Sequence, residues 1–228
     1  MTALKLVIFD CDGTLVDSQH AIVAAMNDAF AAEALAKPPR AAVLSVVGLS
    51  LDLAIARLLP EPADDALVER LALGYKSSFG ERRHRAEVEE PLYPGIRATI
   101  AALAARSDVV LGIATGKSRR GLDAVLEREG LSAHFATRQT ADTHPSKPHP
   151  SMILQALAET GTRADSAVMI GDTTYDIAMA RAAGTSAIGV GWGYHPAADL
   201  AGAGAHAVSS DCVELAAAID RLLFVPKI

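Results

Sequence analysis

Short, almost continuous apolar runs alternate along this chain with longer segments whose apolar residues recur at helical spacing. Runs without alternating polar residues are typical of strands covered on both faces, as in a parallel sheet. The predicted strands are Leu4–Phe9, Val109–Ala114, Phe135–Thr140, Ala167–Ile170, Ala187–Val190 and His206–Val208. The predicted helices between them cover residues 95–106, 118–130, 150–161 and 175–184. This alternation predicts an α/β fold with a doubly wound, mostly parallel sheet.

The alternation is interrupted once, directly after the first predicted strand. From residue 18 to about residue 90 the pattern contains helices only, predicted at residues 21–36, 50–59 and 63–85. The segment "EEPLYPGI" then punctuates the chain with two prolines and a glycine. We therefore expect an all-helical domain at 18–89, inserted into a core domain made of 1–17 and 90–228.

Composition limits the classes of partner. The net charge of −6 provides no basic surface for nucleic acid or an anionic membrane. The longest apolar window, "AAVLSVVGLSLDLAIARLL", is interrupted by Asp52 and Arg57, and the four residues between Lys5 and Asp10 are too few for a signal peptide. Two cysteines form no disulfide framework. We expect a soluble, cytoplasmic monomer or homodimer.

Polar residues follow four of the predicted strands, just where each strand ends. In a doubly wound sheet the ligand lies outside the carboxyl ends of the strands, so these residues are expected to meet at one edge. They are Asp10 and Asp12 after the first strand, Thr115 and Gly116 after the second, Lys147 after the third, and Asp172 and Asp176 after the fourth.

Several carboxylates at one edge need a cation, or some of them must be protonated. Two like charges about 4 Å apart repel by about 4 kcal/mol at an effective dielectric constant near 20. Oxygen ligands without nearby Cys or His at ligand spacing favour Mg²⁺ over zinc, and Mg²⁺ readily shares its ligand shell with phosphate. Lys147 and the Thr115 hydroxyl would then bind the phosphoryl group of a small phosphoester. An aspartate can attack such a group, and a second carboxylate can act as acid and base.

These residues resemble the four motifs of the haloacid dehalogenase-like (HAD) hydrolase superfamily. "DCDGTLVDS" is similar to the first motif, Thr115 in "ATGKS" to the second, Lys147 in "SKPHP" to the third and "GDTTYD" to the fourth. The resemblance extends over the whole chain and includes a helical cap after the first motif. It implies a Rossmann-like core and is strongest to the helical-cap phosphatases, such as the phosphoglycolate phosphatases.

The resemblance also implies roles. Asp10 would be the nucleophile that forms an aspartyl-phosphate, and Asp12 the general acid and base. Thr115 and Lys147 would hold the phosphoryl group. Mg²⁺ would be bound by the Asp10 carboxylate, the Asp12 carbonyl and Asp172, with support from Asp176. The expected substrate is a small phosphorylated metabolite such as 2-phosphoglycolate or a sugar phosphate.

Other functions stay open at this point. The presence of Asp12 argues against dehalogenation, because haloacid dehalogenases are expected to lack the second aspartate. A phosphomutase of the β-phosphoglucomutase type is not excluded by any residue. A catalytically inactive member used for binding is the third alternative, although it would have no need for an acid/base carboxylate beside a nucleophile.

Each candidate residue also has a plain structural interpretation. Thr115, Asp172 and Asp176 suit helix starts, and Lys147 suits a solvated loop. We expect Cys11 to fill space in the core. Two cap features are candidates for substrate contacts: Gly48 in "VVGLS", where a glycine permits close backbone approach, and the arginines of "GERRHR", residues 80–85, which could equally end a solvated helix.

Overall fold

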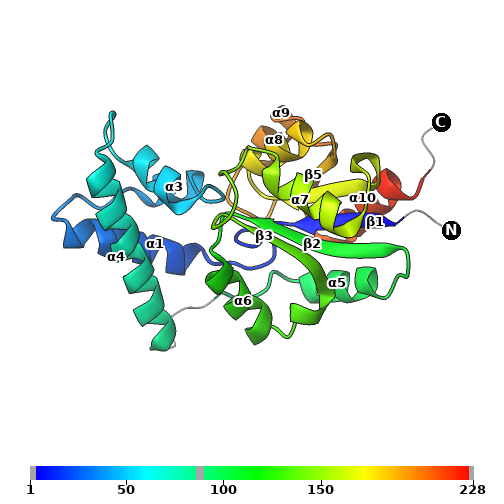
Figure 1. Ribbon diagram of the computed structural model, residues 1–228, viewed down its shortest axis with the longest axis horizontal. Helices are drawn as coiled ribbons and strands as arrows, with labels where there is room; N and C mark the ends of the chain where they lie inside the picture. Colours follow the sequence, from blue (N-terminus) through cyan, green and yellow to red (C-terminus); the bar gives the residue numbers. More distant parts are fainter. Residues whose placement is uncertain (1–3, 86–89, 226–228) are drawn as a thin grey trace.

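The computed structural model describes residues 4–85 and 90–225, which form a helix-covered sheet and a separate group of helices (Figure 1). In this part of the chain the sheet has six strands in the order β3-β2-β1-β4-β5-β6, and each pairing is parallel. The strands are β1 Lys5–Phe9, β2 Val109–Thr115, β3 Phe135–Thr140, β4 Ala167–Gly171, β5 Ser186–Val190 and β6 Ala207–Ser209. The predicted α/β, doubly wound class is confirmed, and every strand boundary lies within one residue of the prediction.

Two hydrophobic clusters, one on each face of the sheet, attach the helices. Helices α5 Ile96–Ala104, α6 Arg119–Arg128 and α10 Cys212–Leu223 pack on one face, where Val7, Phe9 and Ile113 are buried. Helices α7 Ser151–Thr160, α8 Thr174–Ala182 and α9 Ala197–Gly202 pack on the other, over Leu6 and Ile8. Neighbouring residues of β1 therefore enter opposite clusters, as the two-residue period of a strand requires.

The chain order places a switch point at β1. From β1 the chain adds β2 and then β3 on one side, and later β4, β5 and β6 on the other. At such a point the connections leave in opposite directions and open a crevice at the carboxyl ends of the strands. Residues that directly follow β1 and β4 therefore lie beside that crevice.

Residues 18–85 form helices and loops that pack around a hydrophobic cluster of their own. The helices are α1 Gln19–Ala32, α2 Arg40–Ser45, α3 Leu51–Leu58 and α4 Asp65–His84. The cluster contains Ile22, Phe30, Val43, Ile55 and Leu71. We call residues 18–85 the cap. The expected end of the helical domain at residue 89 falls within 86–89, outside the described residues.

The two chain crossings between the cap and the sheet region lie side by side. The Asp17 amide donates to the Pro91 carbonyl over 2.9 Å, and the Tyr93 amide donates to the Leu15 carbonyl over 3.0 Å. Figure 1 shows the cap helices at one end of the molecule, beyond the sheet edge where β2 and β3 end. The cap is thereby attached next to the crevice.

Three helices were not predicted. Helix α2 lies in an apolar window that hid its helical spacing, and α9 is built from "AADLAG", which has a single large apolar side chain. Helix α10 follows the last strand and is capped by Asp211, whose side chain accepts hydrogen bonds from the amides of Val213 and Glu214. Within residues 4–85 and 90–225 no helix combines the length and hydrophobicity needed to cross a bilayer.

Two leucines on helices that cover the sheet test which helix positions are packed against it. Leu122 on α6 is fully buried, whereas Leu154 on α7 is 49% exposed. We expect Leu122→Ala to lower the free energy of unfolding by about 3–5 kcal/mol, because it removes packed atoms and leaves a cavity. Leu154→Ala, the matched control, is expected to change it by no more than about 0.5 kcal/mol. Urea denaturation measures both, and equal effects would contradict this packing.

Candidate active site

Asp10 lies directly after β1 at the switch point and is almost completely buried. Its amide continues the sheet by donating to the Ile170 carbonyl over 2.9 Å. The Cys11 amide donates to its Oδ1 over 2.7 Å, and the Nζ of Lys147 lies 2.9 Å from its Oδ2. Burial, opposed by the Lys147 charge, raises the pKa of Asp10 to about 6. The carboxylate is therefore fixed in position, and its burial makes the ionised form less favourable than in water.

Lys147 connects two carboxylates beneath the crevice. It comes from the loop between β3 and α7, its side chain is fully buried, and its Nζ donates to Asp176 Oδ1 over 2.6 Å. Burial alone would lower the pKa of Lys147, but the charges of Asp10 and Asp176 raise it above its ordinary value. The ammonium therefore stays charged, and the interpretation of Lys147 as a solvated loop residue is wrong.

The second carboxylate oxygen of Asp176 accepts hydrogen bonds at the start of helix α8. Thr173 is the N-cap of α8, and Asp176 Oδ2 accepts hydrogen bonds from the Thr173 amide over 3.1 Å and from its hydroxyl over 2.7 Å. This capping box satisfies amides that a helix start leaves unpaired. Asp176 is thus both a helix cap and the ion-pair partner of Lys147.

Asp172 follows β4 and fits into space left by glycines. Its Oδ1 accepts from the Thr14 hydroxyl over 2.8 Å, and its Oδ2 from the Tyr194 amide over 2.9 Å. A Cβ on Gly13, whose φ is 81°, would lie 2.2 Å from Asp172 Oδ2, and one on Gly193 would lie 2.1 Å from its Cβ. Burial and the nearby carboxylates raise the pKa of Asp172 well above its usual range. The glycines permit this close approach, and within residues 4–85 and 90–225 Asp172 has hydrogen-bond donors but no ion-pair partner.

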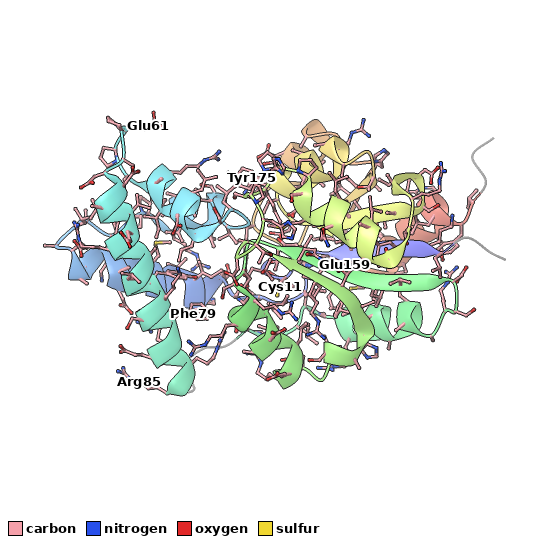
Figure 2. All side chains as sticks on the ribbon, in the orientation of Figure 1. Cys11, Glu61, Phe79, Arg85, Glu159 and Tyr175 are labelled. Carbon is pink, nitrogen blue, oxygen red and sulfur yellow. The ribbon has the colours of Figure 1, made fainter. Side chains whose placement is uncertain are left out.

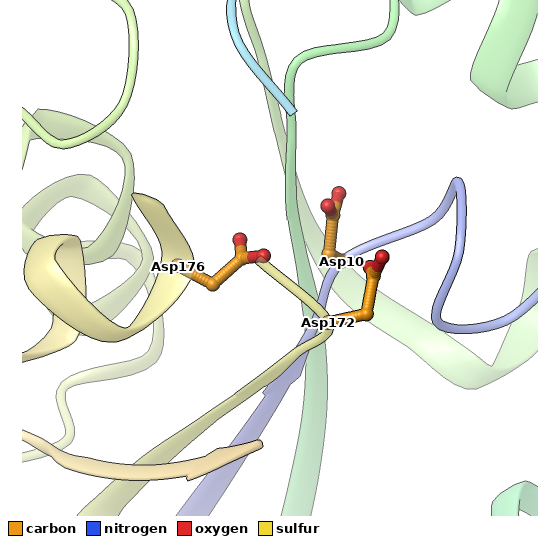
Figure 3. Close-up of side chains that lie close together, drawn as sticks. All are labelled: Asp10, Asp172 and Asp176. Atoms are coloured by element: carbon orange, nitrogen blue, oxygen red, sulfur yellow. The ribbon is translucent and has the colours of Figure 1, made fainter. Parts of the chain in front are cut away.

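Asp10, Asp172 and Asp176 converge from the ends of β1 and β4 and the start of α8 (Figure 3). Each offers one carboxylate oxygen, and these oxygens lie within 4.8 Å of one another. Among the described residues, Lys147 pairs with Asp10 and Asp176 and no cation pairs with Asp172, so the three buried carboxylates exceed the positive charge that is paired with them. The all-oxygen donor set and the excess negative charge fit a hard divalent cation such as Mg²⁺.

Asp12 lies at the wall of the crevice and is held by two groups. Its Oδ1 accepts from the Ser18 hydroxyl over 2.6 Å and from the Nζ of Lys117 over 2.8 Å. Lys117 also donates to Glu90 Oε1 over 2.8 Å, and the Glu90 side chain is fully buried. Burial alone would lower the pKa of Lys117, but Asp12 and Glu90 raise it, which keeps the ammonium charged beside Asp12.

Sequence reasoning assigned no role to Lys117 or Glu90. Lys117 stands two residues after Thr115 in the loop that ends β2, and this position was a usable signal. Glu90 reaches Lys117 across 27 residues of sequence, and no local pattern indicates that contact. Both residues belong to the site through tertiary structure.

Thr115 and Gly116 lie where β2 ends, directly against a cap loop. Thr115 is buried, and its Oγ1 accepts from the Lys117 amide over 3.2 Å. A Cβ on Gly116 would lie 2.5 Å from the Gly48 carbonyl, so only a glycine fits here. Gly48 has a φ of 97°, in the left-handed region that favours glycine. The structure therefore brings Gly48 of the cap into contact with Gly116 of the core.

A cavity of about 440 Å³ lies between the cap and the sheet edge. Of the candidate residues, Asp10, Asp12, Thr115, Gly116 and Gly48 line it. Lys147, Asp172 and Asp176 do not line the cavity and lie behind Asp10. The candidates thus form one connected group with an outer layer open to a ligand and a buried inner layer.

Cys11 is buried in the hydrophobic cluster around Phe9 and Leu15, as expected of a space-filling residue (Figure 2). Burial raises the pKa of its thiol well above the ordinary value. Because the thiolate is the reactive form of cysteine, this thiol is unsuited to nucleophilic attack.

Comparison with known proteins agrees with the geometry. Residues 7–190 match the family model of the haloacid dehalogenase-like hydrolases. The chain is 36% identical over 222 residues to the probable phosphatase IndB of Dickeya dadantii, covering 96% of this chain and 94% of the relative. It is also 36% identical over 226 residues to the phosphoglycolate phosphatase of Rhodospirillum rubrum, covering 92% of this chain and 89% of that protein.

A solved structure shares the whole fold. The structure of a predicted phosphatase from Clostridium acetobutylicum superposes with a TM-score of 0.86 at 25% identity, covering 96% of this chain and all of that one. The resemblance inferred from the four motifs is confirmed by these similarities, which extend over both the sheet and the cap. The chain therefore belongs to the haloacid dehalogenase-like hydrolases and groups with their phosphatases.

Proposed function

We propose that the protein is a Mg²⁺-dependent phosphomonoester hydrolase that acts on a small phosphorylated metabolite through an aspartyl-phosphate at Asp10. One observation carries this proposal: Asp10 faces the cavity, while Lys147 and two further carboxylates lie directly behind it. This arrangement gives a fixed nucleophile, a fixed positive charge and a donor set for a divalent cation.

The nucleophile and the acid/base group are two residues apart. Asp10 attacks phosphorus, and the bond between phosphorus and the ester oxygen breaks. Asp12 donates a proton to the leaving oxygen and then takes one from the water that hydrolyses the aspartyl-phosphate. Ser18 and Lys117 contact Oδ1 of Asp12, which leaves Oδ2 for the proton transfers.

The remaining candidates bind the phosphoryl group and the metal. At the cavity wall, the Thr115 hydroxyl and the Gly116 amide would donate to the phosphoryl oxygens, and the Lys147 ammonium behind Asp10 would add positive charge. Asp10, Asp172, Asp176 and the Asp12 carbonyl would hold Mg²⁺, which when bound neutralises negative charge on the phosphate. Gly48 lets the cap loop approach the substrate.

The relatives suggest a first substrate to test. The Rhodospirillum rubrum relative is named a phosphoglycolate phosphatase, and 2-phosphoglycolate is accordingly our first candidate among small phosphorylated metabolites. A phosphomutase would instead transfer the group to a second hydroxyl and release an isomer without free phosphate. An inactive binding protein would release neither.

Phosphate release tests the hydrolase. We expect release from members of a phosphometabolite panel that includes 2-phosphoglycolate, and we expect it to stop when Mg²⁺ is chelated. Asp10→Asn should reduce kcat by about a thousandfold or more, because the amide is a poor nucleophile. Asp165→Asn is the control, since Asp165 is exposed and pairs with Arg163 just before β4. Isomer formation without phosphate release would identify a mutase instead.

Thermal unfolding tests the metal site independently of turnover. A ligand at 100 times its Kd adds about 2.7 kcal/mol of stability, which for a protein of this size is a Tm increase of roughly 5–10 °C. We expect Mg²⁺ to produce such an increase in the unaltered protein. Asp172→Asn should lose most of it, because one carboxylate ligand is gone. An equal Mg²⁺ effect in both proteins would argue against Asp172 as a ligand.

A further inference from the structure

The cap end of the cavity carries a cation whose hydrogen-bonding capacity is largely unused. Arg83 on α4 lines the cavity, and its Nε and Nη2 are buried without a hydrogen-bond partner among the described residues. Glu90 Oε2 lies 3.7 Å from Nη2, which is an ion pair but too long for a hydrogen bond. Buried donors are normally paired, so these two point to a ligand that the cavity takes.

Glu90 is itself engaged by other cations. Lys117 donates to its Oε1 over 2.8 Å, and Arg128 contacts its Oε2 over 3.3 Å and its carbonyl over 2.6 Å. These shorter contacts already use both carboxylate oxygens. Arg83 is therefore the outermost of three cations around one carboxylate, with charge left for a second anion.

The neighbouring arginines of the same helix turn away from the cavity. Arg82 pairs with Asp28 over 2.6 Å, and Arg85 pairs with Glu81 over 3.4 Å near the end of α4 (Figure 2). Arg83 instead stacks over Phe79, with its guanidinium carbon 5.3 Å from the ring centre. Of the three arginines that the sequence left undecided, Arg83 is the one that reaches the cavity.

The cavity that Arg83 and Asp10 both line is large and mainly apolar. Its wall contains Ile22, Met26, Val43, Val47, Tyr75 and Phe79. At about 440 Å³ the cavity falls within the roughly 300–1,000 Å³ of pockets that enclose drug-sized ligands. A two-carbon glycolate would leave most of this wall without contacts, so the wall is suited to a larger leaving group.

We propose that Arg83 binds a second anionic group, a carboxylate or a phosphate, at the far end of the substrate's leaving group. This inference rests on the proposed hydrolase function. The reacting phosphoryl group lies at Asp10, the middle of the leaving group contacts the apolar wall, and the second anion receives hydrogen bonds from the Arg83 guanidinium. Arginine suits this role because its planar fork can bind carboxylate or phosphate through two parallel hydrogen bonds.

Four phosphomonoesters test the proposal through kcat/KM: phenyl phosphate, 4-carboxyphenyl phosphate, 1,4-phenylene bisphosphate and 2-phosphoglycolate. Arg83→Met should reduce kcat/KM about 10- to 150-fold for an ester whose second anion reaches Arg83, because the variant loses a hydrogen bond to a charged group. Phenyl phosphate should change less than about threefold. The carboxylate and bisphosphate esters separate the two anions, and the larger loss identifies the one that Arg83 prefers.

Arg82→Met is the matched control, because it removes the same charge one residue away on the outer face of α4. We expect Arg82→Met to leave the ratio of kcat/KM between the charged esters and phenyl phosphate unchanged. Arg83→Lys keeps the charge without the fork and should lose less than Arg83→Met, which provides a test if the methionine variant unfolds. Equal losses for phenyl phosphate and both charged aromatic esters would overturn the anion site. If Arg83→Met lowered kcat/KM more for 2-phosphoglycolate than for the aromatic esters, the inference that the leaving group is longer than glycolate would be wrong.

Binding of compounds that cannot be hydrolysed separates this proposal from the hydrolase itself. Calorimetry with Mg²⁺ compares benzylphosphonate with 4-carboxybenzylphosphonate. We expect the carboxylate to improve the Kd of the unaltered protein at least tenfold, and Arg83→Met to abolish that improvement. If no ester is hydrolysed but this difference is present, the anion site stands and the hydrolase function falls. If the esters are hydrolysed but the carboxylate does not improve the Kd, the hydrolase function stands and the anion site falls.

Discussion

The repulsion among three buried carboxylates is the constraint on which this site depends. Asp10, Asp172 and Asp176 offer oxygens within 4.8 Å of one another, and in the part of the chain that the structure describes Lys147 is the cation that pairs with them. Burying charges is unfavourable unless partners are fixed around them. The sheet fixes Asp10, the capping box fixes Asp176, and hydrogen bonds from Thr14 and Tyr194 fix Asp172. The fold holds the carboxylates together in an arrangement that a divalent cation would relieve.

The candidate site is built from two parts of the chain. The carboxyl edge of the parallel sheet supplies Asp10, Asp12 and Thr115, and the cap supplies most of the apolar wall of the cavity. The two parts also touch directly: the Ser50 amide donates to Ser146 Oγ over 2.8 Å, and the Tyr175 hydroxyl donates to the Ser45 carbonyl over 3.0 Å. Substitutions in the cap can therefore alter the shape of the cavity without replacing any of the three carboxylates.

Much of this arrangement could be predicted from local pattern. Apolar runs located the strands, and the geometry of a parallel sheet brought Asp10 and Asp172 to one edge although 162 positions separate them. The contact of Glu90 with Lys117 could not be predicted, because it depends on how the cap returns to the core. The place of Arg83 could be predicted only in part. Tyr75, Phe79 and Arg83 recur every four residues and share one helix face, but the sequence does not say that this face meets the cavity.

Asp176 shows how a small site can limit its own evolution. One of its oxygens accepts hydrogen bonds at the start of α8 and the other pairs with Lys147, so a single carboxylate serves both local folding and the charge balance beside Asp10. Replacement by Asn would keep an acceptor for only one of these tasks, because its amide has a single carbonyl oxygen. A lineage that lost the chemistry would therefore still be held near aspartate by the helix. Its sequence could preserve the signature of an active site long after the activity had gone.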